Sequence, residues 1–144
     1  MKPNLHLNSN GSLPGSKLIL VLDEEEQSSQ QLKQSLEDLG HRIDVHPSMS
    51  DFQIAELDLA KFDLVICDLD NGLGLWRFLL ERIRELRLDT QLVLTSQKAA
   101  ETEWLEALQL GVFDFLVKPY SKSEILRVTA NALTMNYNRM FKTA

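Results

Sequence analysis

Five polar residues stand directly after short apolar runs in this sequence. Asp23 and Glu24 follow one run, Asp68 follows another, and Thr95 and Lys118 end two more. Carboxylates that share a pocket repel each other, and a bound divalent cation such as Mg²⁺, which favours oxygen ligands, removes that repulsion. A carboxylate such as that of Asp68 can then act as a nucleophile and form an aspartyl phosphate.

Lys118 and Thr95 are the two kinds of side chain that an anionic phosphoryl group needs around it. An ammonium group can pair with one phosphoryl oxygen, a hydroxyl group can donate to another, and the metal can neutralise the developing charge. Each residue alone has a plainer interpretation: Asp68 could cap a turn, Thr95 could end a strand and Lys118 could lie on the surface. The occurrence of all five at equivalent places favours a shared site.

The elements that must position these residues follow from the spacing of apolar residues. Continuous apolar runs of four or five residues predict strands that are buried on both faces, and apolar residues three or four apart predict helices. Alternation of the two predicts an α/β fold with a parallel sheet between two layers of helices. The expected strands are 18–22, 42–46, 64–67, 92–94 and 113–117, and the expected helices are 27–39, 50–60, 75–87, 99–110 and 121 to about 140.

A parallel sheet of this kind has a preferred place for a ligand. Ligands bind in the crevice beyond the carboxyl ends of the strands, at the point where the strand order reverses. If the strand order is 2-1-3-4-5, that point lies between the first and third strands. Asp23, Glu24 and Asp68 would then converge there.

Composition excludes several classes of function. The chain has 144 residues, with 15 Lys and Arg against 21 Asp and Glu and a net charge of −6, so we expect no direct nucleic-acid binding by this domain. Arg82, Arg84 and Arg87 alternate with acidic residues and predict a solvated helix face. No apolar run approaches the roughly 20 residues that cross a bilayer, so no membrane association is expected.

The single cysteine bears on the redox environment of the protein, and the ends of the chain bear on its domain boundaries. Cys67 has no partner for an internal disulfide, which suits a reducing cytoplasm, and it is expected to be a packed core thiol. Residues 1–16 are rich in Asn, Ser, Gly and Pro and lack the apolar centre of a signal peptide. We therefore expect a disordered leader at 1–16, one domain at 17–140 and a flexible tail at 141–144.

Residues 17–137 resemble the receiver domain of two-component response regulators. Four stretches carry the resemblance: VLDEEE at 21–26, DLVICDLDN at 63–71, LVLTS at 92–96 and GVFDFLVKPY at 111–120. The resemblance implies a flavodoxin-like doubly wound (βα)5 three-layer sandwich with strand order 2-1-3-4-5. It also implies a phosphoprotein of signal transduction that is not itself an enzyme.

The resemblance assigns a role to each candidate residue. Asp68 would accept the phosphoryl group from a histidine kinase or a phosphotransfer protein. Asp23 and Glu24 would hold Mg²⁺ with Asp68 and the backbone carbonyl of Asp70. Thr95 and Lys118 would contact the phosphoryl oxygens. Phe115 resembles the switch aromatic that moves inward when Thr95 closes on the phosphate. This movement would change the surface of the fourth helix, fifth strand and fifth helix, which would then bind a partner or a second copy of the chain. The Lys118–Pro119 bond is expected to be cis, as is typical of the family.

Several positions depart from the pattern of the family. Glu24 stands where a second Asp is usual, Gly72 stands where Pro is usual, and Trp76 stands at the mouth of the site where Gly is common. Asp70 and Gln97 occupy positions that tune how fast the phosphate is lost in the family. Glu24, Gly72, Trp76 and Asp70 motivate an alternative, a pseudo-receiver that is not phosphorylated and acts as a protein-interaction module.

An enzyme on the same scaffold is a further alternative. A flavin site would need a phosphate-binding loop after the first strand, where this chain has acidic residues. A phosphatase of the aspartyl class would need a second Asp two residues after its nucleophile, and Asp70 stands there.

The predicted fourth helix carries a tryptophan whose role the spacing leaves open. If Leu105, Ala107 and Leu108 point at the sheet, Trp104 points toward solvent. It is then either a partly buried aromatic residue or an interface anchor for a partner or a second copy.

Overall fold

The computed structural model describes residues 15–69, 74–97 and 101–141. Five parallel strands form one sheet in the order β2-β1-β3-β4-β5, which confirms the predicted flavodoxin-like topology. The strands are β1 Leu18–Leu22, β2 Arg42–His46, β3 Leu64–Asp68, β4 Gln91–Ser96 and β5 Asp114–Val117. Most of the predicted leader, and the tail beyond Phe141, lie outside the described residues.

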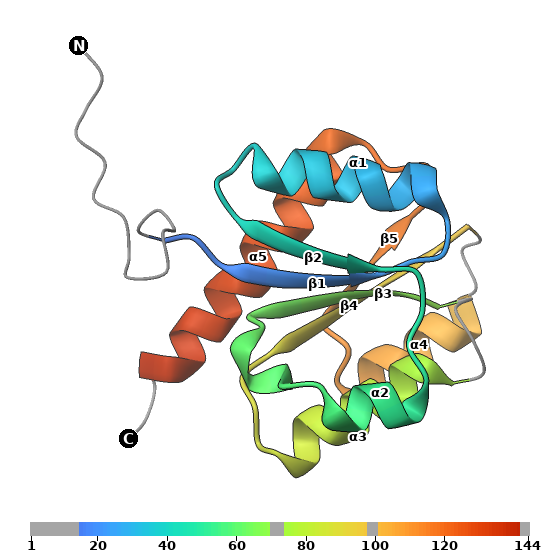
Figure 1. Cartoon of the computed structure of the whole chain (residues 1–144), viewed down its shortest axis with the longest axis vertical. Coiled ribbons are helices and arrows are strands. Elements are labelled where there is room, and N and C mark those ends of the chain that lie inside the picture. The colour runs from blue at the N-terminus through green and yellow to red at the C-terminus, as the bar shows by residue number, and fades with distance from the viewer. Residues whose placement is uncertain (1–14, 70–73, 98–100, 142–144) are drawn as a thin grey trace.

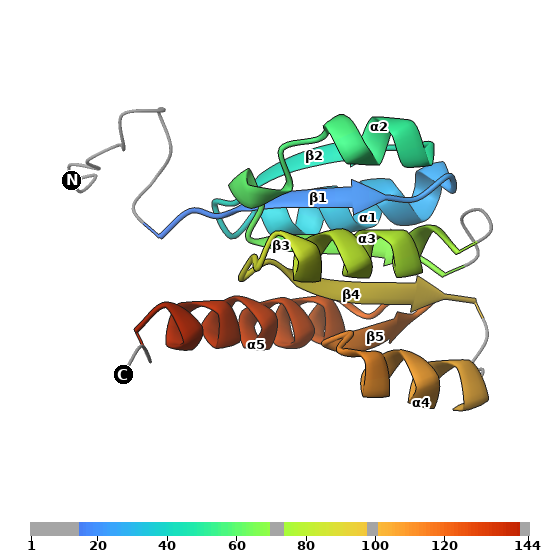
Figure 2. The same ribbon diagram turned by 90° about the horizontal axis from the view of Figure 1, so that it is seen from below.

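The helices form two layers, one on each face of the sheet (Figures 1 and 2). Helices α1 and α5 cover one face, and α2, α3 and α4 cover the other. Their bounds are α1 Glu26–Glu37, α2 Asp51–Glu56, α3 Leu75–Glu85, α4 Glu101–Leu110 and α5 Lys122–Phe141, with a 3-10 turn at Leu59–Lys61. Within the described parts of the chain, no helix is long and apolar enough to span a membrane.

Burial on both faces explains why the strands are runs of apolar residues. Alternate residues of β1 point to opposite layers: Leu20 and Leu22 pack with α2–α4, whereas Ile19 and Val21 pack with α1 and α5. Each of these four side chains is fully buried. The apolar surface removed from water is the main stabilising contribution to the sheet.

The second helix is shorter than the sequence predicts. The expected helix covers 50–60, but α2 ends at Glu56 and the backbone becomes extended at Leu57. Ile54 and Leu59 are both fully or almost fully buried in the same cluster. Five residues along one helix are separated by about 140°, so a continuous helix could not point both side chains into the core. Ser50 caps the start of the helix through a capping box with Gln53.

Strand β4 is longer than predicted, and the difference matters for the site. The expected strand covers 92–94, whereas the observed strand runs to Ser96 and includes Thr95. Thr95 is thereby the cross-strand partner of Asp68, the last residue of β3. The two side chains are placed by adjacent strands rather than by loops.

Candidate functional site

The carboxyl ends of β1, β3, β4 and β5 lie at one edge of the sheet and hold the candidate residues there. Leu22 pairs with Cys67, which sets Asp23 and Asp68 one residue further along two neighbouring strands. Two backbone hydrogen bonds of 2.8 Å extend this edge, from Leu69 N–H to the Thr95 carbonyl and from Lys118 N–H to the Ser96 carbonyl. The parallel register therefore brings residues from four separate stretches of sequence together.

The ammonium group of Lys118 is the centre of this cluster. Its Nζ lies 2.9 Å from Asp68 Oδ2, 3.1 Å from Asp23 Oδ2 and 3.3 Å from Glu25 Oε2. Burial by itself lowers the pKa of Lys118, but hydrogen bonds to Asp68 and Asp23 outweigh burial and raise that pKa above its ordinary value. Lys118 is therefore a permanent cation at neutral pH, paired with three carboxylates.

Asp23 has a second task at the start of α1. Its Oδ1 accepts a hydrogen bond of 2.9 Å from the Glu25 backbone N–H, and its Oδ2 accepts one from the Ser28 hydroxyl. The Asp23 side chain is 1% exposed, so these donors and Lys118 take the place of the hydrogen bonds that water would give its carboxyl group. The same residue both caps the turn into α1 and supplies a carboxylate to the site.

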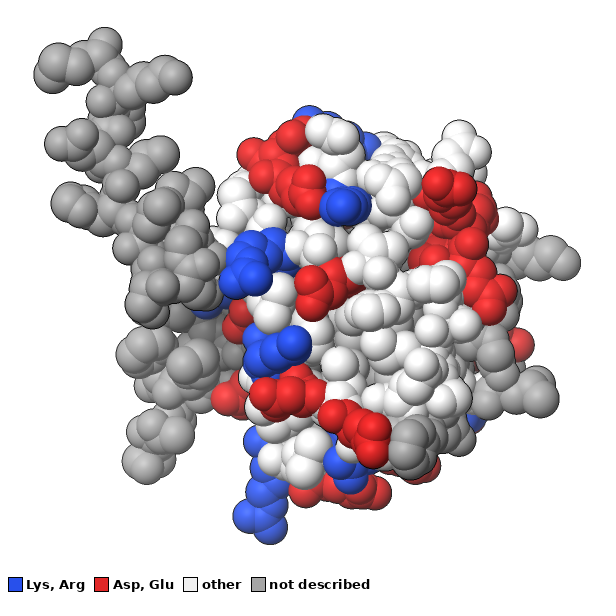
Figure 3. Space-filling view, in the orientation of Figure 1, with Lys and Arg blue, Asp and Glu red and all other residues white. Residues whose placement is uncertain are grey.

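Glu25 and Ser28 belong to the cluster although the sequence did not single them out. Glu25 Oε2 accepts a hydrogen bond of 3.1 Å from Gln97 Nε2 in addition to its contact with Lys118. This pair joins the turn after β1 to the residue that follows β4. An acidic run is visible in the sequence, and acidic side chains gather near the start of α1 on the surface (Figure 3). The run alone does not show which of its side chains turns inward.

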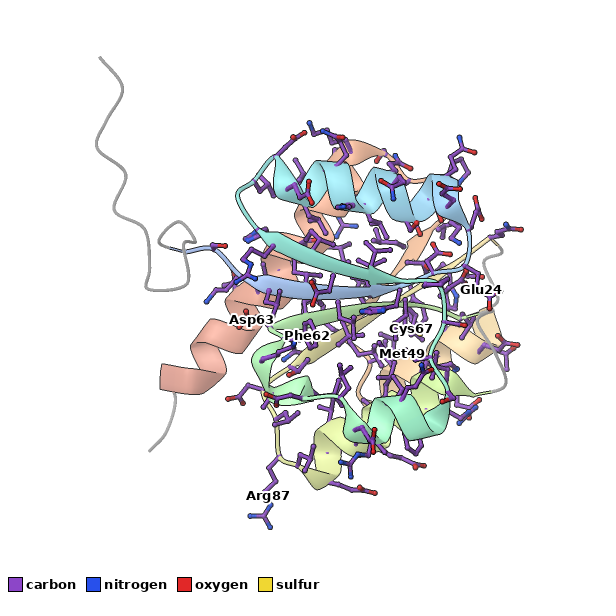
Figure 4. All side chains as sticks on the ribbon, in the orientation of Figure 1. Glu24, Met49, Phe62, Asp63, Cys67 and Arg87 are labelled. Carbon is purple, nitrogen blue, oxygen red and sulfur yellow. The ribbon has the colours of Figure 1, made fainter. Side chains whose placement is uncertain are left out.

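Of the predicted metal ligands, Asp23 and Asp68 lie in the cluster and Glu24 does not. Glu24 is exposed, with neither a hydrogen bond nor an ion pair to the part of the chain that is described; Figure 4 shows it at the strand-end edge. Asp70 lies outside the described residues, as does Gly72. No group of three His, Cys, Asp or Glu side chains that could hold a metal occurs within the described ranges. Asp23 and Asp68 offer the oxygen donors that Mg²⁺ prefers, with Lys118 between them.

Thr95 and Tyr120 place two buried hydroxyl groups beside the cluster. Neither hydroxyl oxygen has a hydrogen-bond partner among the described residues. Burial raises the pKa of Tyr120 to about 12, while the nearby Thr95 hydroxyl and the Lys118 ammonium act in the opposite direction. The two hydroxyls are thus close enough to interact but do not have the geometry of a hydrogen bond. Tyr120 was part of the matched motif without an assigned role.

The predicted orientation of α4 is wrong. Leu105 and Leu108 are 59% and 46% exposed, whereas Ala107 is buried and Trp104 packs against the core. The Trp104 ring stacks on Phe115, with centroids 4.6 Å apart and planes 9° apart. Both faces of α4 carry apolar residues, so spacing could not choose between them. The larger area of the indole ring and its stacking partner decide the orientation.

Other predicted residues also have defined places. Trp76, a residue of α3, is buried in the core and is not open at the mouth of the site. The guanidinium of Arg77 lies 4.6 Å from the centroid of the Trp76 ring. Burial raises the pKa of Cys67 far above that of a free thiol, and Asp68 and Asp23 add to the rise. Cys67 is therefore a protonated core thiol. The Lys118–Pro119 bond is cis, as expected.

Comparison with known proteins shows the family. The response regulator receiver domain family matches residues 19–130. The chain is 32% identical over 113 residues to the two-component response regulator PprB of Pseudomonas aeruginosa, covering 75% of this chain and 40% of PprB. It is 32% identical over 117 residues to the transcriptional regulatory protein ResD of Bacillus subtilis, covering 78% of this chain and 46% of ResD. This chain belongs to the response regulator receiver domain family of two-component systems.

Solved structures show the same fold. The signal receiver domain of a putative Luxo repressor protein from Vibrio parahaemolyticus superposes with a TM-score of 0.76 at 18% identity, covering 90% of this chain and 99% of that one. The chemotaxis response regulator CheY4 of Vibrio cholerae gives a TM-score of 0.69 at 18% identity, covering 82% and 99%. The chain spans less than half the length of the curated relatives PprB and ResD.

Proposed function

We propose that this domain accepts a phosphoryl group on Asp68 from a histidine kinase or a phosphotransfer protein. The observation that carries the proposal is the placement of Lys118 Nζ 2.9 Å from Asp68 Oδ2, with Thr95 in register beside Asp68 on the adjacent strand. This arrangement sets a nucleophile, a cation and a hydroxyl donor at one sheet edge. Because Asp68 is only partly buried, a phosphodonor can reach it.

The residues divide the chemistry among them. A carboxylate oxygen of Asp68 bonds to phosphorus while the bond from phosphorus to the donor breaks, and the donor leaves with that electron pair. Lys118, which the raised pKa keeps charged, exchanges one carboxylate contact for a phosphoryl oxygen. The Thr95 hydroxyl donates to a second phosphoryl oxygen. Lys118 is already in place beside Asp68, so its charge needs little reorganisation, whereas the Thr95 hydroxyl turns toward the phosphoryl group once that group is present.

A divalent cation fits the donor chemistry of the site. Asp23, Asp68 and the backbone carbonyl of Asp70 would hold Mg²⁺, joined by Glu24 if its exposed side chain turns inward, and the ion would neutralise negative charge on the phosphoryl oxygens. Lys118 shares Asp23 and Asp68 with any such ion. Asp23 remains anchored by Ser28 and by the Glu25 N–H, so its orientation does not depend on the ion.

The signal would leave the site through Thr95, Phe115 and α4. Movement of Thr95 toward a phosphoryl group would let Phe115 move inward, and Phe115 is linked to Trp104 by ring stacking. A change at Phe115 would therefore reach α4, which exposes Leu105 and Leu108. We infer that the surface of α4, β5 and α5 binds a partner or a second copy in the cytoplasm, with no role for nucleic acid or membrane.

Mass measurement tests the proposal directly. Incubation with Mg²⁺ and acetyl phosphate should add one phosphoryl group to the wild type and none to Asp68→Asn. Asp63→Asn is the matched control, because Asp63 directly precedes β3 and its Oδ2 accepts a hydrogen bond of 3.0 Å from Leu18 N–H, which an amide oxygen can still accept. Labelling of Asp68→Asn equal to that of the wild type would place the phosphoryl group elsewhere.

A pseudo-receiver is the second candidate function, because the same Lys118 cluster also suits a purely structural role. Three carboxylates hold the Lys118 ammonium, and the described residues do not form a cluster of three metal-binding side chains. Such a site would be a structural ion network in a constitutive binding module. Absence of labelling on the wild type, under conditions that label another receiver domain, would select this candidate.

A further inference from the structure

Two hydroxyl groups lie buried beside the Lys118 cluster, and the proposed function gives a role to that of Thr95 but none to that of Tyr120. Thr95 is 1% exposed and Tyr120 is 6% exposed, and both hydroxyl oxygens lack a hydrogen-bond partner among the described residues. A buried hydroxyl without a partner loses the hydrogen bonds that water would supply. Such a pair is expected where a ligand or a changed conformation completes the bonding.

The Tyr120 side chain is held in place by its surroundings. Its ring packs in the layer under α1 and α5 with Ile125 and Val128. Its backbone carbonyl accepts a hydrogen bond of 2.9 Å from Gln31 Nε2 on α1. The hydroxyl lies near the Thr95 side chain, and because a tyrosine ring is rigid and has few rotamers, this packing leaves the hydroxyl little freedom to move away. Since burial raises its pKa to about 12, the phenol is a hydrogen-bond donor at neutral pH.

The order of acceptor strength decides how the two hydroxyls can bond. The Thr95 hydroxyl has one proton, and a phosphoryl oxygen is a stronger acceptor than a phenol oxygen. When an anionic oxygen is present on Asp68, the Thr95 proton goes to it and Thr95 Oγ1 is left as an acceptor. The nearby Tyr120 O–H can donate a hydrogen bond to this Thr95 oxygen. No proton is transferred from one residue to another in this arrangement.

We propose that Tyr120 is a positioning residue, whose phenol O–H donates to Thr95 Oγ1 while the Thr95 O–H donates to the phosphoryl group on Asp68. The resulting chain of two hydrogen bonds polarises the Thr95 hydroxyl and fixes its rotation toward the phosphoryl group. Tyr120 would thus stabilise the phosphorylated state without touching the phosphoryl group. The inference rests on the proposed function of Asp68.

Binding of beryllofluoride, a tetrahedral stand-in for the phosphoryl group, tests the inference on the full chain with Mg²⁺. The apparent Kd is measured by ¹⁹F NMR for the wild type, Tyr120→Phe, Thr95→Ala and the double variant. We expect Tyr120→Phe to weaken binding about fivefold, the effect of one neutral hydrogen bond. Because Tyr120 acts through Thr95, the double variant should bind no more weakly than Thr95→Ala alone.

Thr129→Val separates positioning from general loosening of the fold. Thr129 carries another buried hydroxyl without a partner among the described residues, about two turns along α5 from its start. This variant should leave the beryllofluoride Kd unchanged. If the wild type binds beryllofluoride and Tyr120→Phe has the same Kd, the inference about Tyr120 is overturned while the proposed function of Asp68 stands. The same holds if the effects of Tyr120→Phe and Thr95→Ala on the Kd are independent in the double variant. Failure of the wild type to bind would instead overturn the proposed function of Asp68.

Discussion

Replacement of Lys118 by Met is expected to destabilise the fold substantially, because it removes the cation from three carboxylates. The Lys118 and Asp23 side chains are 6% and 1% exposed, and Asp68 is 12% exposed. Breaking a buried ion pair by removing one partner costs about 3–5 kcal/mol. Met is similar in length and apolar, so the loss is one of charge rather than of packing volume.

The lower end of that range applies here. Asp23 keeps the hydrogen bonds from Ser28 and from the Glu25 N–H, and the 42% exposed Glu25 side chain can turn to water. We therefore expect a decrease of about 3 kcal/mol in the free energy of unfolding. With a urea slope of about 1.5–2 kcal/mol/M for a domain of this size, the midpoint should fall by about 1.5–2 M.

Urea denaturation followed by circular dichroism, in buffer that contains a chelator instead of Mg²⁺, measures this change. Lys33→Met is the matched control, because Lys33 and Glu37 form an exposed pair at 3.9 Å on α1 and should contribute less than about 0.5 kcal/mol. Addition of Asp23→Asn to Lys118→Met should recover part of the loss, since it removes the unpaired buried charge. A Lys118→Met variant within about 0.5 kcal/mol of the wild type would refute the reasoning.

Three further predictions concern other parts of the fold. Trp104→Ala should lower the free energy of unfolding by about 2–3 kcal/mol, because it removes the ring stacked on Phe115; equality with the wild type in urea denaturation would contradict the stacked arrangement. Gly111→Ala should cost about 2 kcal/mol by the same assay, since Gly111 has φ +113°, and an added Cβ would also lie 2.8 Å from the Arg84 guanidinium; a neutral result would show that the turn relaxes. Burial lowers the pKa of His41 below 6.5, Lys17 adds to this and Asp63 opposes it, so the neutral ring is favoured in the fold. The unfolded chain binds the proton more readily, so the free energy of unfolding should fall as the pH drops from 7.5 through 6.5 toward the lower pKa of His41 in the fold. His41→Gln should show a smaller fall, and an equal fall in both proteins would contradict the lowered pKa of His41.

The strands and the class of fold could be predicted from the sequence because burial on both faces leaves a simple pattern. Leu18–Leu22 and Leu64–Cys67 are continuous apolar runs, and each ends where the chain meets the polar edge of the sheet. The site was visible for the same reason, because Asp23 and Asp68 follow these two runs and Lys118 follows the apolar residues at the end of β5. Local patterns of this kind need no knowledge of distant contacts.

The orientation of α4 could not be predicted because two stripes of that helix are apolar. Contact with Phe115, a residue of a different element, decides that Trp104 faces inward and that Leu105 and Leu108 face out. The end of α2 was missed for a related reason. Burial of both Ile54 and Leu59 depends on where the sheet lies, and the helical propensity of the segment contains no such information.

The residue types at the strand ends were determined by the sequence itself, and they defined a carboxylate, a lysine and a hydroxyl at one sheet edge. Only the tertiary structure decided that Glu25 rather than Glu24 turns toward Lys118, and that Tyr120 comes beside Thr95. The physical reason is that side-chain direction in a turn depends on which donors and acceptors the neighbouring strands present. Those neighbours come from parts of the chain about 70 to 95 residues apart, as in the Glu25–Gln97 and Lys118–Asp23 contacts.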